Sequence, residues 1–221
     1  MARSYGGLWE QFITWENFIT AYEGARESGK HSEVGRQFHH KWTENLAVLR
    51  QELIAGAWSP LPYARFLAYR EPKVRQIETP AYRDRIVHHA IVQILEPIFE
   101  RRFIYDSYSC RKGKGIHNAV DRAEQFIREA HAQWGKVYIL KADISKFFPS
   151  IDHGILLKLI GAAVREARFM DVISKAFFAP GSEVGVPIGA LTSQLGSNIY
   201  MDGLDHHIKD GLRTRYYLRY A

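Results

Sequence analysis

An aspartate at the end of an apolar segment could serve as a metal ligand. Asp143 follows Val137–Ala142, a run that predicts a strand buried on both faces. A carboxylate there is costly to desolvate unless a positive group compensates it, so a salt bridge or helix N-cap is one interpretation. The other is a hard oxygen ligand for Mg²⁺ in phosphoryl transfer, although one carboxylate cannot hold two ions. Phe148, four spacers further on, favours the second, because it would place a flat ring beside a metal-bound sugar.

Two cations lie on one face of a predicted hairpin. Ala64–Tyr69 and Arg75–Thr79 have the pattern of strands around the turn Glu71-Pro72-Lys73. Lys73 and Arg75 are two positions apart, so their side chains point to the same side of the strand. Paired cations suit a triphosphate, to which arginine can make bidentate contacts. A solvated edge strand would use the same residues.

A basic loop alternates cations with glycines. Arg111, Lys112 and Lys114 are interleaved with Gly113 and Gly115. Glycines let a backbone approach phosphates closely, and the cations neutralise them. The composition fits a nucleic-acid contact and a plain solvated loop equally well.

A glycine-rich turn runs into a predicted helix N-terminus. The segment Gly185–Gln194 contains Gly189, Ser193 and Gln194. Its glycines permit close contact with a base pair or sugar, and the exposed N–H groups at a helix start favour anions. A structural turn would use the same glycines.

Composition narrows the class of protein. The chain has 221 residues, 46% of them hydrophobic, with a net charge of +6 and a sequence pI of about 9.4. This charge favours a polyanionic partner without identifying one. The single cysteine, Cys110, excludes an internal disulfide framework and fits a reducing compartment.

Adjacent histidine pairs such as His88-His89 diverge on a helix and do not chelate. No apolar run approaches the roughly 20 residues that span a bilayer, and Met1–Tyr5 does not begin a signal peptide, so we expect a cytoplasmic protein without membrane contact.

Apolar periodicity places these residues on elements. Pro97 should kink or end the first half of the third expected helix, and a further strand is expected at Thr214–Tyr220. The order of helices, hairpin and single strands predicts an α+β fold. The expected helices cover Leu8–Tyr22, Phe38–Leu53, Arg83–Phe103, Asn118–Ala130, a segment capped by Asp152 and running to about Arg168, and Thr192–Gly211.

Taken together, the segments resemble a bacterial reverse transcriptase of the group containing group II intron, retron and diversity-generating retroelement enzymes. The resemblance extends in order over nearly the whole chain. Its motifs are Lys73-Val74-Arg75 with Thr79–Arg85, Leu95–Glu100, Ser107–His117, Asp143–Phe148 and Gly189–Gln194.

One motif departs from the intron and retron pattern. Those enzymes read Pro-Gln-Gly and then Ser-Pro, whereas Ile188 and Gln194 stand here in place of the glutamine and the second proline. This version is similar to the diversity-generating retroelement subgroup, which is associated with error-prone copying of RNA. Antiviral defence reverse transcriptases share parts of the pattern, so the biological setting stays open.

The resemblance implies a right-hand polymerase fold, with helix-rich fingers and a small antiparallel palm sheet. Residues 1–135 would form N-terminal helices and fingers. Residues 136–221 would form a partial palm, with a finger-linked insertion at about 160–197 and no thumb. Val137–Asp143 and Thr214–Tyr220 would be neighbouring antiparallel strands.

The resemblance also implies roles for single residues. Asp143 would bind Mg²⁺ through its carboxylate and Ile144 through its backbone carbonyl, two ions being held in the complete enzyme. Phe148 would lie under the sugar. Lys73 and Arg75 would hold the triphosphate. The other implied contacts are Gly189, Ser193 and Gln194 for the nucleotide, and Arg111, Lys112 and Lys114 for the template.

The implied partners are an RNA template, a DNA or RNA primer and dNTP, with an accessory protein as a further candidate. The family pattern continues after Tyr220-Ala221 into two aspartates, so we expect this chain alone to be inactive in RNA-directed DNA synthesis. The alternative function is a non-catalytic nucleic-acid-binding relic or one subunit of a split polymerase. A helical protein–protein scaffold would explain the apolar stripes but not the ordered motifs.

Overall fold

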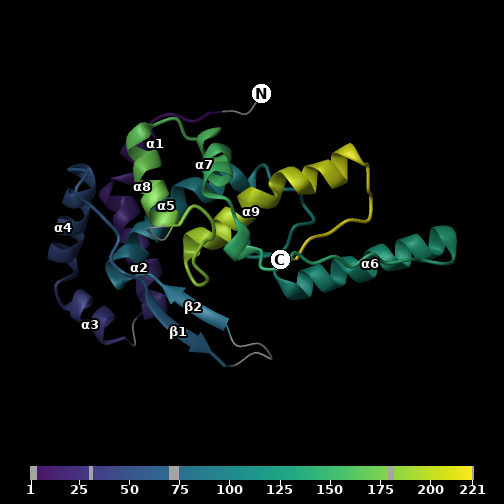
Figure 1. Ribbon diagram of the computed structural model, residues 1–221, viewed down its shortest axis with the longest axis horizontal. Helices are drawn as coiled ribbons and strands as arrows, with labels where there is room; N and C mark the ends of the chain where they lie inside the picture. The colour runs from purple at the N-terminus through teal and green to yellow at the C-terminus, as the bar shows by residue number, and fades with distance from the viewer. Residues whose placement is uncertain (1–3, 30–31, 70–74, 179–181, 221) are drawn as a thin grey trace.

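The computed structural model describes residues 4–29, 32–69, 75–178 and 182–220, with the side chains of Ser28 and Arg75 left out. Helices dominate it, and one small antiparallel sheet accompanies them (Figure 1). The elements are α1 Leu8–Phe12, α2 Trp15–Gly29, α3 Glu33–His40, α4 Trp42–Ile54, β1 Ala64–Ala68, β2 Arg75–Thr79, α5 Tyr82–Glu100, α6 Ile116–Trp134, the 3₁₀ turn η1 Phe148–Ser150, α7 His153–Gly161, α8 Ala167–Phe177, α9 Leu191–His206 and the π-helical turn η2 His207–Gly211.

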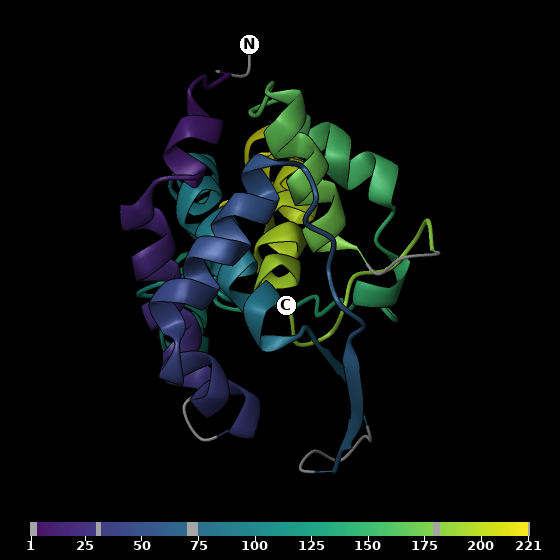
Figure 2. The same cartoon turned by 90° about the vertical axis from the view of Figure 1, so that its left-hand side faces the viewer.

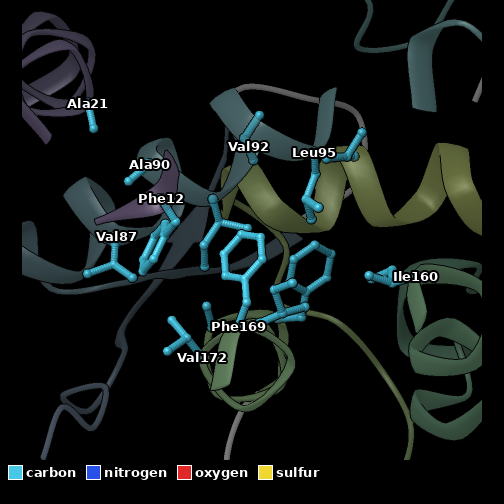
Figure 3. Close-up of a cluster of buried hydrophobic side chains, with 14 of the residues drawn as sticks. Phe12, Ala21, Val87, Ala90, Val92, Leu95, Ile160, Phe169 and Val172 are labelled. Carbon is cyan, nitrogen blue, oxygen red and sulfur yellow. The ribbon is translucent and has the colours of Figure 1, made fainter. Parts of the chain in front are cut away.

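Helix α5 is the centre of the core. It packs against α1, α2, α3, α8 and α9. Val87, Ile91 and Leu95 on its apolar face are fully buried, as the helical spacing of apolar residues in this segment predicted. Around it, the rings of Phe12 and Phe169 lie 4.9 Å apart, which joins α1 to α8 (Figure 3). The core therefore gathers helices from both halves of the chain around α5.

The first predicted helix is in fact two helices. α1 and α2 replace the single helix expected over Leu8–Tyr22. Thr14 starts the second one, because its hydroxyl accepts a hydrogen bond from the backbone N–H of Asn17. The restart also changes the buried face, so that Trp15 is 45% exposed while Phe18 is fully buried.

The second expected helix is also divided, because Lys41, with φ −126° and ψ 41°, separates α3 from α4. The helix expected to run to about Arg168 ends at Gly161, and α8, which begins at Ala167, was not predicted. The predicted cap at Asp152 is confirmed, since its carboxylate accepts from the backbone N–H of Ile155 at 2.8 Å. Pro97 lies in the last turn of α5, which continues past it to Glu100.

The predicted hairpin is confirmed. Strands β1 and β2 pair antiparallel with Ala64 opposite Thr79 and Ala68 opposite Arg75. The hairpin projects from the helical body (Figures 1 and 2). The turn that joins the strands, including Lys73, is outside the described residues.

Helix α6 extends away from the body, and the segment that follows α9 returns beside it (Figure 1). Tyr216 makes this contact: its ring centroid lies 5.4 Å from that of Phe126 and 5.7 Å from that of Trp134. Arg215 adds an ion pair of 3.3 Å with Glu129. These contacts attach the C-terminal segment to the helix that precedes the Asp143 region.

The two expected palm strands are wrong for this structure. Residues 137–144 have no regular secondary structure, and Tyr138 and Leu140 are 83% and 94% exposed. Thr214–Tyr220 forms only an isolated parallel bridge, in which Arg219 pairs with Ser107. A strand needs a hydrogen-bonding neighbour, and no backbone hydrogen bond joins residues 137–144 to another described residue.

The remaining architecture agrees with a helix-rich α+β fold, but its only sheet among the described residues is the β1–β2 hairpin. The division into fingers, 1–135, and partial palm, 136–221, stays a prediction. Among the described helices, none has the length and apolarity that crossing a bilayer requires.

Candidate functional site

The β1–β2 hairpin and the glycine-rich turn are in direct contact. The backbone N–H of Glu78 on β2 donates to the carbonyl of Ile188 at 2.8 Å. Gly189 has φ +120°, and a Cβ placed there would stand 3.0 Å from both the Glu78 carbonyl oxygen and Ile77 Cγ2. The sequence needs glycine here for the conformation and for the close approach. Two motifs that are far apart in the chain therefore share one surface.

The same turn is joined to the segment that follows Asp143. The backbone N–H of Val186 donates to the Phe148 carbonyl at 3.0 Å, and that of Gly185 donates to the Ile151 carbonyl at 2.8 Å. Asp152 completes an antiparallel bridge with Val184. The hairpin, the glycine turn and the segment 148–152 thus converge.

Phe148, the predicted sugar-facing ring, is half-buried. Its neighbour Phe147 packs edge-to-face on it, with ring centroids 5.8 Å apart, and also contacts Tyr200 of α9. This packing fixes the aromatic pair between the glycine turn and α9 while part of the Phe148 ring stays accessible.

Asp143 is exposed and has no hydrogen bond or ion pair with any residue that the structure describes. Ile144 is 47% exposed. Asp143 has the oxygen chemistry of one Mg²⁺ ligand. Within the described ranges, however, no three His, Cys, Asp or Glu side chains are grouped to hold a metal ion. The described residues therefore do not complete a magnesium site around Asp143.

The start of α9 separates its two predicted nucleotide contacts. Ser193 is fully buried, and its hydroxyl has no hydrogen-bond partner. Gln194 is exposed and lines a small cavity together with Cys110 and Arg111. Of the pair, only Gln194 presents its side chain to the surface.

A larger groove of about 700 Å³ lies between α2 and α5. Glu23 and Glu27 line it from α2, His89 and Glu96 line it from α5, and Lys112 also lines it. Its mixed charge does not match a phosphate site, because carboxylates repel phosphates.

The three loop cations differ in availability. Arg111 is buried: its guanidinium donates to both carboxylate oxygens of Glu100, to the Ile104 carbonyl and to Ser107. In the structure Arg111 therefore shapes the loop from inside, and its expected contact with a template stays a prediction. Lys112 is the most open, with its side chain 88% exposed and an ion pair of 2.8 Å to Glu96.

Lys114 is less available to a ligand than Lys112 but more available than Arg111. Its ammonium lies 3.5 Å from the ring centroid of Tyr105 and 5.0 Å from that of Tyr108, and it donates to the Tyr105 carbonyl. Burial, with help from the nearby Arg111 charge, lowers the pKa of Lys114. The two predicted triphosphate ligands remain untested, because Lys73 is outside the described residues and Arg75 is described only as the first residue of β2.

A buried polar network next to the loop was missed by sequence reasoning. Asp205 of α9 pairs with Arg219 at 2.9 Å, and the exposed fractions of their side chains are 1% and 7%. Asn198 accepts from the Arg219 guanidinium at 3.1 Å. The signal was available: Asn198, Asp202 and Asp205 follow helical steps of four and three on a face where core residues are expected.

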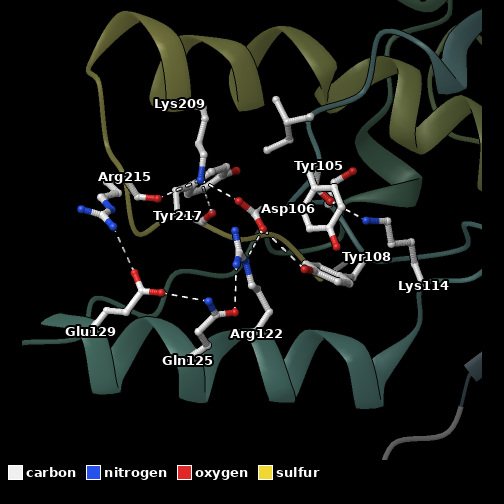
Figure 4. Close-up of polar contacts among 12 residues, drawn as sticks. Tyr105, Asp106, Tyr108, Lys114, Arg122, Gln125, Glu129, Lys209, Arg215 and Tyr217 are labelled. Carbon is white, nitrogen blue, oxygen red and sulfur yellow. Dashed lines mark hydrogen bonds and ion pairs between the residues drawn. The ribbon is translucent and has the colours of Figure 1, made fainter. Parts of the chain in front are cut away.

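A second centre of this network is Asp106, which is 2% exposed (Figure 4). Arg122 of α6 donates to it at 2.8 Å and Lys209 of η2 at 2.7 Å. Burial alone would raise the pKa of Asp106, but the two cations hold it below its usual range. The network therefore fastens the loop after α5 to α6 and to the end of α9.

Comparison with known proteins places the chain in a family. Residues 70–221 match the family described as reverse transcriptase (RNA-dependent DNA polymerase). Protein YkfC of Escherichia coli (strain K12) is 31% identical over 174 residues, which cover 75% of this chain and 45% of that protein. Group II intron-encoded protein LtrA of Lactococcus lactis subsp. cremoris is 25% identical over 207 residues, 89% of this chain and 33% of the relative.

A plant protein shows a shorter match. Nuclear intron maturase 1, mitochondrial, of Arabidopsis thaliana is 30% identical over 107 residues, 47% of this chain and 14% of the relative. The chain thus spans less than half the length of each of these three relatives. The family match, by contrast, covers well over half of the chain and includes each segment that converges on the glycine turn. The chain belongs to the reverse transcriptase (RNA-dependent DNA polymerase) family.

Proposed function

We propose that this chain holds the template and the incoming nucleotide in an RNA-directed DNA polymerase that works by nucleotidyl transfer. The observation that carries the proposal is the convergence of three segments. The glycine turn contacts β2 through Glu78 and Ile188, and it contacts the Asp143–Phe148 motif through Val186 and Phe148. A polymerase requires such a convergence, because one nucleotide must meet a phosphate clamp, a sugar-facing ring and a template base together.

Within this site the proposed triphosphate ligands are Lys73, which lies outside the described residues, and Arg75, the first residue of β2. Phe148 supports the sugar, and its partial exposure allows this contact. Gly189 and Gln194 face the base pair. The buried hydroxyl of Ser193 points to a packing role for that residue instead.

Asp143, with the Ile144 carbonyl, is proposed as one part of the magnesium site. When bound, Mg²⁺ supplies the electrostatic stabilisation that phosphoryl transfer needs. The exposure of Asp143 and its lack of a partner among the described residues support this role, because a carboxylate used in a structural ion pair would be occupied. The remaining ligands come from outside the described residues.

The proposed partners are an RNA template, a DNA or RNA primer and dNTP, with a cytoplasmic setting. Lys112 and Lys114 are the template-facing cations. Ile188 and Gln194 depart from the motif of intron and retron enzymes, so a role in a diversity-generating retroelement or in antiviral defence stays a prediction. Intron proteins are among the relatives of the chain.

The test is extension of a primer on an RNA template with Mg²⁺ and dNTP. The protein is assayed as this chain and as the longer product wherever the gene continues past Ala221. We expect extension by the longer product and its loss in Asp143→Ala. Phe148→Val should retain extension and admit ribonucleotides. Extension that survives Asp143→Ala contradicts the proposed site.

A second candidate is a non-catalytic nucleic-acid-binding module, or one subunit of a split polymerase. It is favoured by the finding that, among the described residues, Asp143 belongs to no group of three or more His, Cys, Asp or Glu side chains that could hold a metal ion. Such a module would bind RNA with strong salt dependence and show no Mg²⁺-dependent extension alone. Extension that appears only on adding a second protein identifies the split enzyme.

A further inference from the structure

We infer that Asp205, Asn198 and Arg219 are positioning residues that hold the basic loop 109–115 in the shape that binds RNA. This inference rests on the proposed function, since it assigns the loop to the template. None of the three side chains needs to touch RNA, because the ion pair and Asn198 are buried.

The first step is the rigidity of the buried pair. Arg219 Nε lies 3.0 Å from each carboxylate oxygen of Asp205, and its Nη2 donates to Asn198 at 3.1 Å. Tyr217 adds a hydrogen bond of 2.7 Å to Asp205. A guanidinium that is held at several nitrogens has one orientation, so the Arg219 backbone is fixed relative to α9.

The second step connects the fixed backbone to the loop. The Arg219 N–H donates to the Asp106 carbonyl at 2.9 Å, and the Tyr108 N–H donates to the Arg219 carbonyl at 2.9 Å. Asn198 contacts the loop directly, because its side-chain amide donates to the Ser109 carbonyl at 2.9 Å. Two independent attachments therefore meet at residues 106–109, where the basic loop begins.

The third step is the far end of the loop. The Gly115 N–H donates to the Tyr108 carbonyl at 3.1 Å, which closes the loop onto the same anchor. Arg111 reinforces it from inside through Ser107, which is fully buried. The exposed Lys112 is carried on this closed loop, so its position depends on the anchor below it.

The geometry also links the loop to the nucleotide motif. Gln194 and Asn198 both lie on α9, one turn apart, and both line the small cavity next to Arg111. A shift of Asn198 would therefore displace the basic loop 109–115 relative to Gln194 and the glycine turn. Asp205 and Asn198 would therefore affect RNA binding by fixing the position of the basic loop relative to the start of α9.

The structural arm of the test is amide hydrogen exchange in the free chain. Asp205→Asn should speed exchange of the Tyr108, Gly115 and Arg219 amides by at least about tenfold, without changing the α5 core. Asp171→Asn is the matched control, since it removes an exposed carboxylate that pairs with Lys175 on α8. Unchanged exchange in Asp205→Asn overturns the inference.

The functional arm measures binding of a fluorescein-labelled single-stranded RNA over a salt series. We expect Asp205→Asn and Asn198→Ala to weaken binding about tenfold and to lower the salt slope by about 0.7 for each lost phosphate contact. Lys112→Ala should lower the slope in the wild-type background and add nothing to Asp205→Asn. A purely structural role would reduce stability, leave the salt slope unchanged and make the effects of Lys112→Ala and Asp205→Asn additive.

Each failure has its own signature. Equal slopes in the wild type and the variants, or additive effects of Lys112→Ala and Asp205→Asn, overturn the positioning role. If Asp205→Asn does not fold, Tyr217→Phe removes one hydrogen bond from the same carboxylate and should produce the same changes at smaller size. A wild-type chain that binds no RNA overturns the proposed function, and the exchange comparison then decides separately whether Asp205 holds the loop.

Discussion

The backbone N–H of Glu78 donates a 2.8 Å hydrogen bond to the carbonyl of Ile188, and this bond joins the β hairpin to the turn that starts α9. Beside it, Gly189 approaches the Glu78 carbonyl so closely that a Cβ would stand 3.0 Å away. The hairpin otherwise projects from the helical body (Figure 2). Its position relative to α9 therefore depends on a contact that any side chain at Gly189 would disturb.

Gly189→Ala should destabilise the chain and loosen the hairpin. The backbone at φ +120° is strained for alanine, and the added methyl group meets the Glu78 carbonyl and Ile77. We expect a loss of about 1–3 kcal/mol in the free energy of unfolding. Thermal unfolding measures the loss, and limited proteolysis within 64–79 should become faster.

Gly203→Ala is the control for this prediction. Gly203 lies inside α9, and no atom lies within 4 Å of a Cβ placed there. Alanine should raise the free energy of unfolding by about 0.5–1 kcal/mol, because it favours the helix. Equal effects of the two alanines would mean that the contact between β2 and the turn is absent in solution.

Local signals were sufficient for the elements that the sequence predicted well. The hairpin has strand residues on both sides of a turn, and Asp152 is a side chain that caps a helix through its own neighbours. Val87, Ile91 and Leu95 of α5 have helical spacing and are buried as expected. Such elements depend on residues that are close in the chain, so sequence reasoning reached them.

Elements that depend on distant partners were not predictable in the same way. The apolar run before Asp143 has the composition of a strand, but a strand forms only beside a neighbour, and Leu140 is 94% exposed instead. The bridge of Arg219 to Ser107 likewise depends on Asp205, which draws the C-terminal segment toward α9. The charge of Arg111 suggested an exposed side chain that contacts a template, and the sequence could not show that this side chain is buried within its loop.

Arg111→Ala should mainly reduce stability, whereas Lys112→Ala should mainly reduce RNA affinity. Removing Arg111 leaves the carbonyls of Ile104 and Ser107 without their buried donor and the 40% exposed Glu100 without its ion pair, so we expect a loss of about 1–3 kcal/mol in stability. Lys112 is 88% exposed, and its removal should cost less than about 0.5 kcal/mol. Chemical denaturation measures both. RNA affinity should fall for Lys112→Ala despite its unchanged stability, and a large stability loss in that variant would contradict the assignment.

Asp202→Asn should stabilise the chain. One carboxylate oxygen of Asp202 is buried without a hydrogen-bond partner, and the nearest His206 nitrogen is 3.6 Å away. Burial raises the pKa of Asp202, so the folded state binds a proton more readily than the unfolded chain and stability falls as pH rises through that window. Asparagine lacks this charge. We expect a gain of about 1 kcal/mol at neutral pH.

Thermal unfolding as a function of pH checks the Asp202 prediction. The melting temperature of Asp202→Asn should exceed that of the wild type by about 2–4 °C at neutral pH. The difference should shrink as pH falls toward the ordinary carboxyl value of 3.8. A variant that is less stable than the wild type at neutral pH would show that Asp202 gains more from His206 than burial costs it.

Comparing the stabilities of Asp106→Asn and Asp143→Asn distinguishes a carboxylate that stabilises the fold from one proposed to bind a metal ion. Asp106 is buried between Arg122 and Lys209, so its neutralisation should cost about 3–5 kcal/mol at neutral pH. Because the pKa of Asp106 is lowered, its contribution is present above the ordinary value of 3.8 and is lost as pH falls through the folded value. The gap between wild type and Asp106→Asn should therefore close in acid.

Asp143→Asn should leave the free energy of unfolding at neutral pH within about 0.5 kcal/mol of the wild type, because Asp143 is exposed and has no partner among the described residues. Denaturant titrations from neutral pH to pH about 3 compare both variants with the wild type. A substantial stability loss in Asp143→Asn would show that the carboxylate belongs to a structural ion pair. A carboxylate that contributes nothing to stability and is nevertheless required for primer extension has a chemical role.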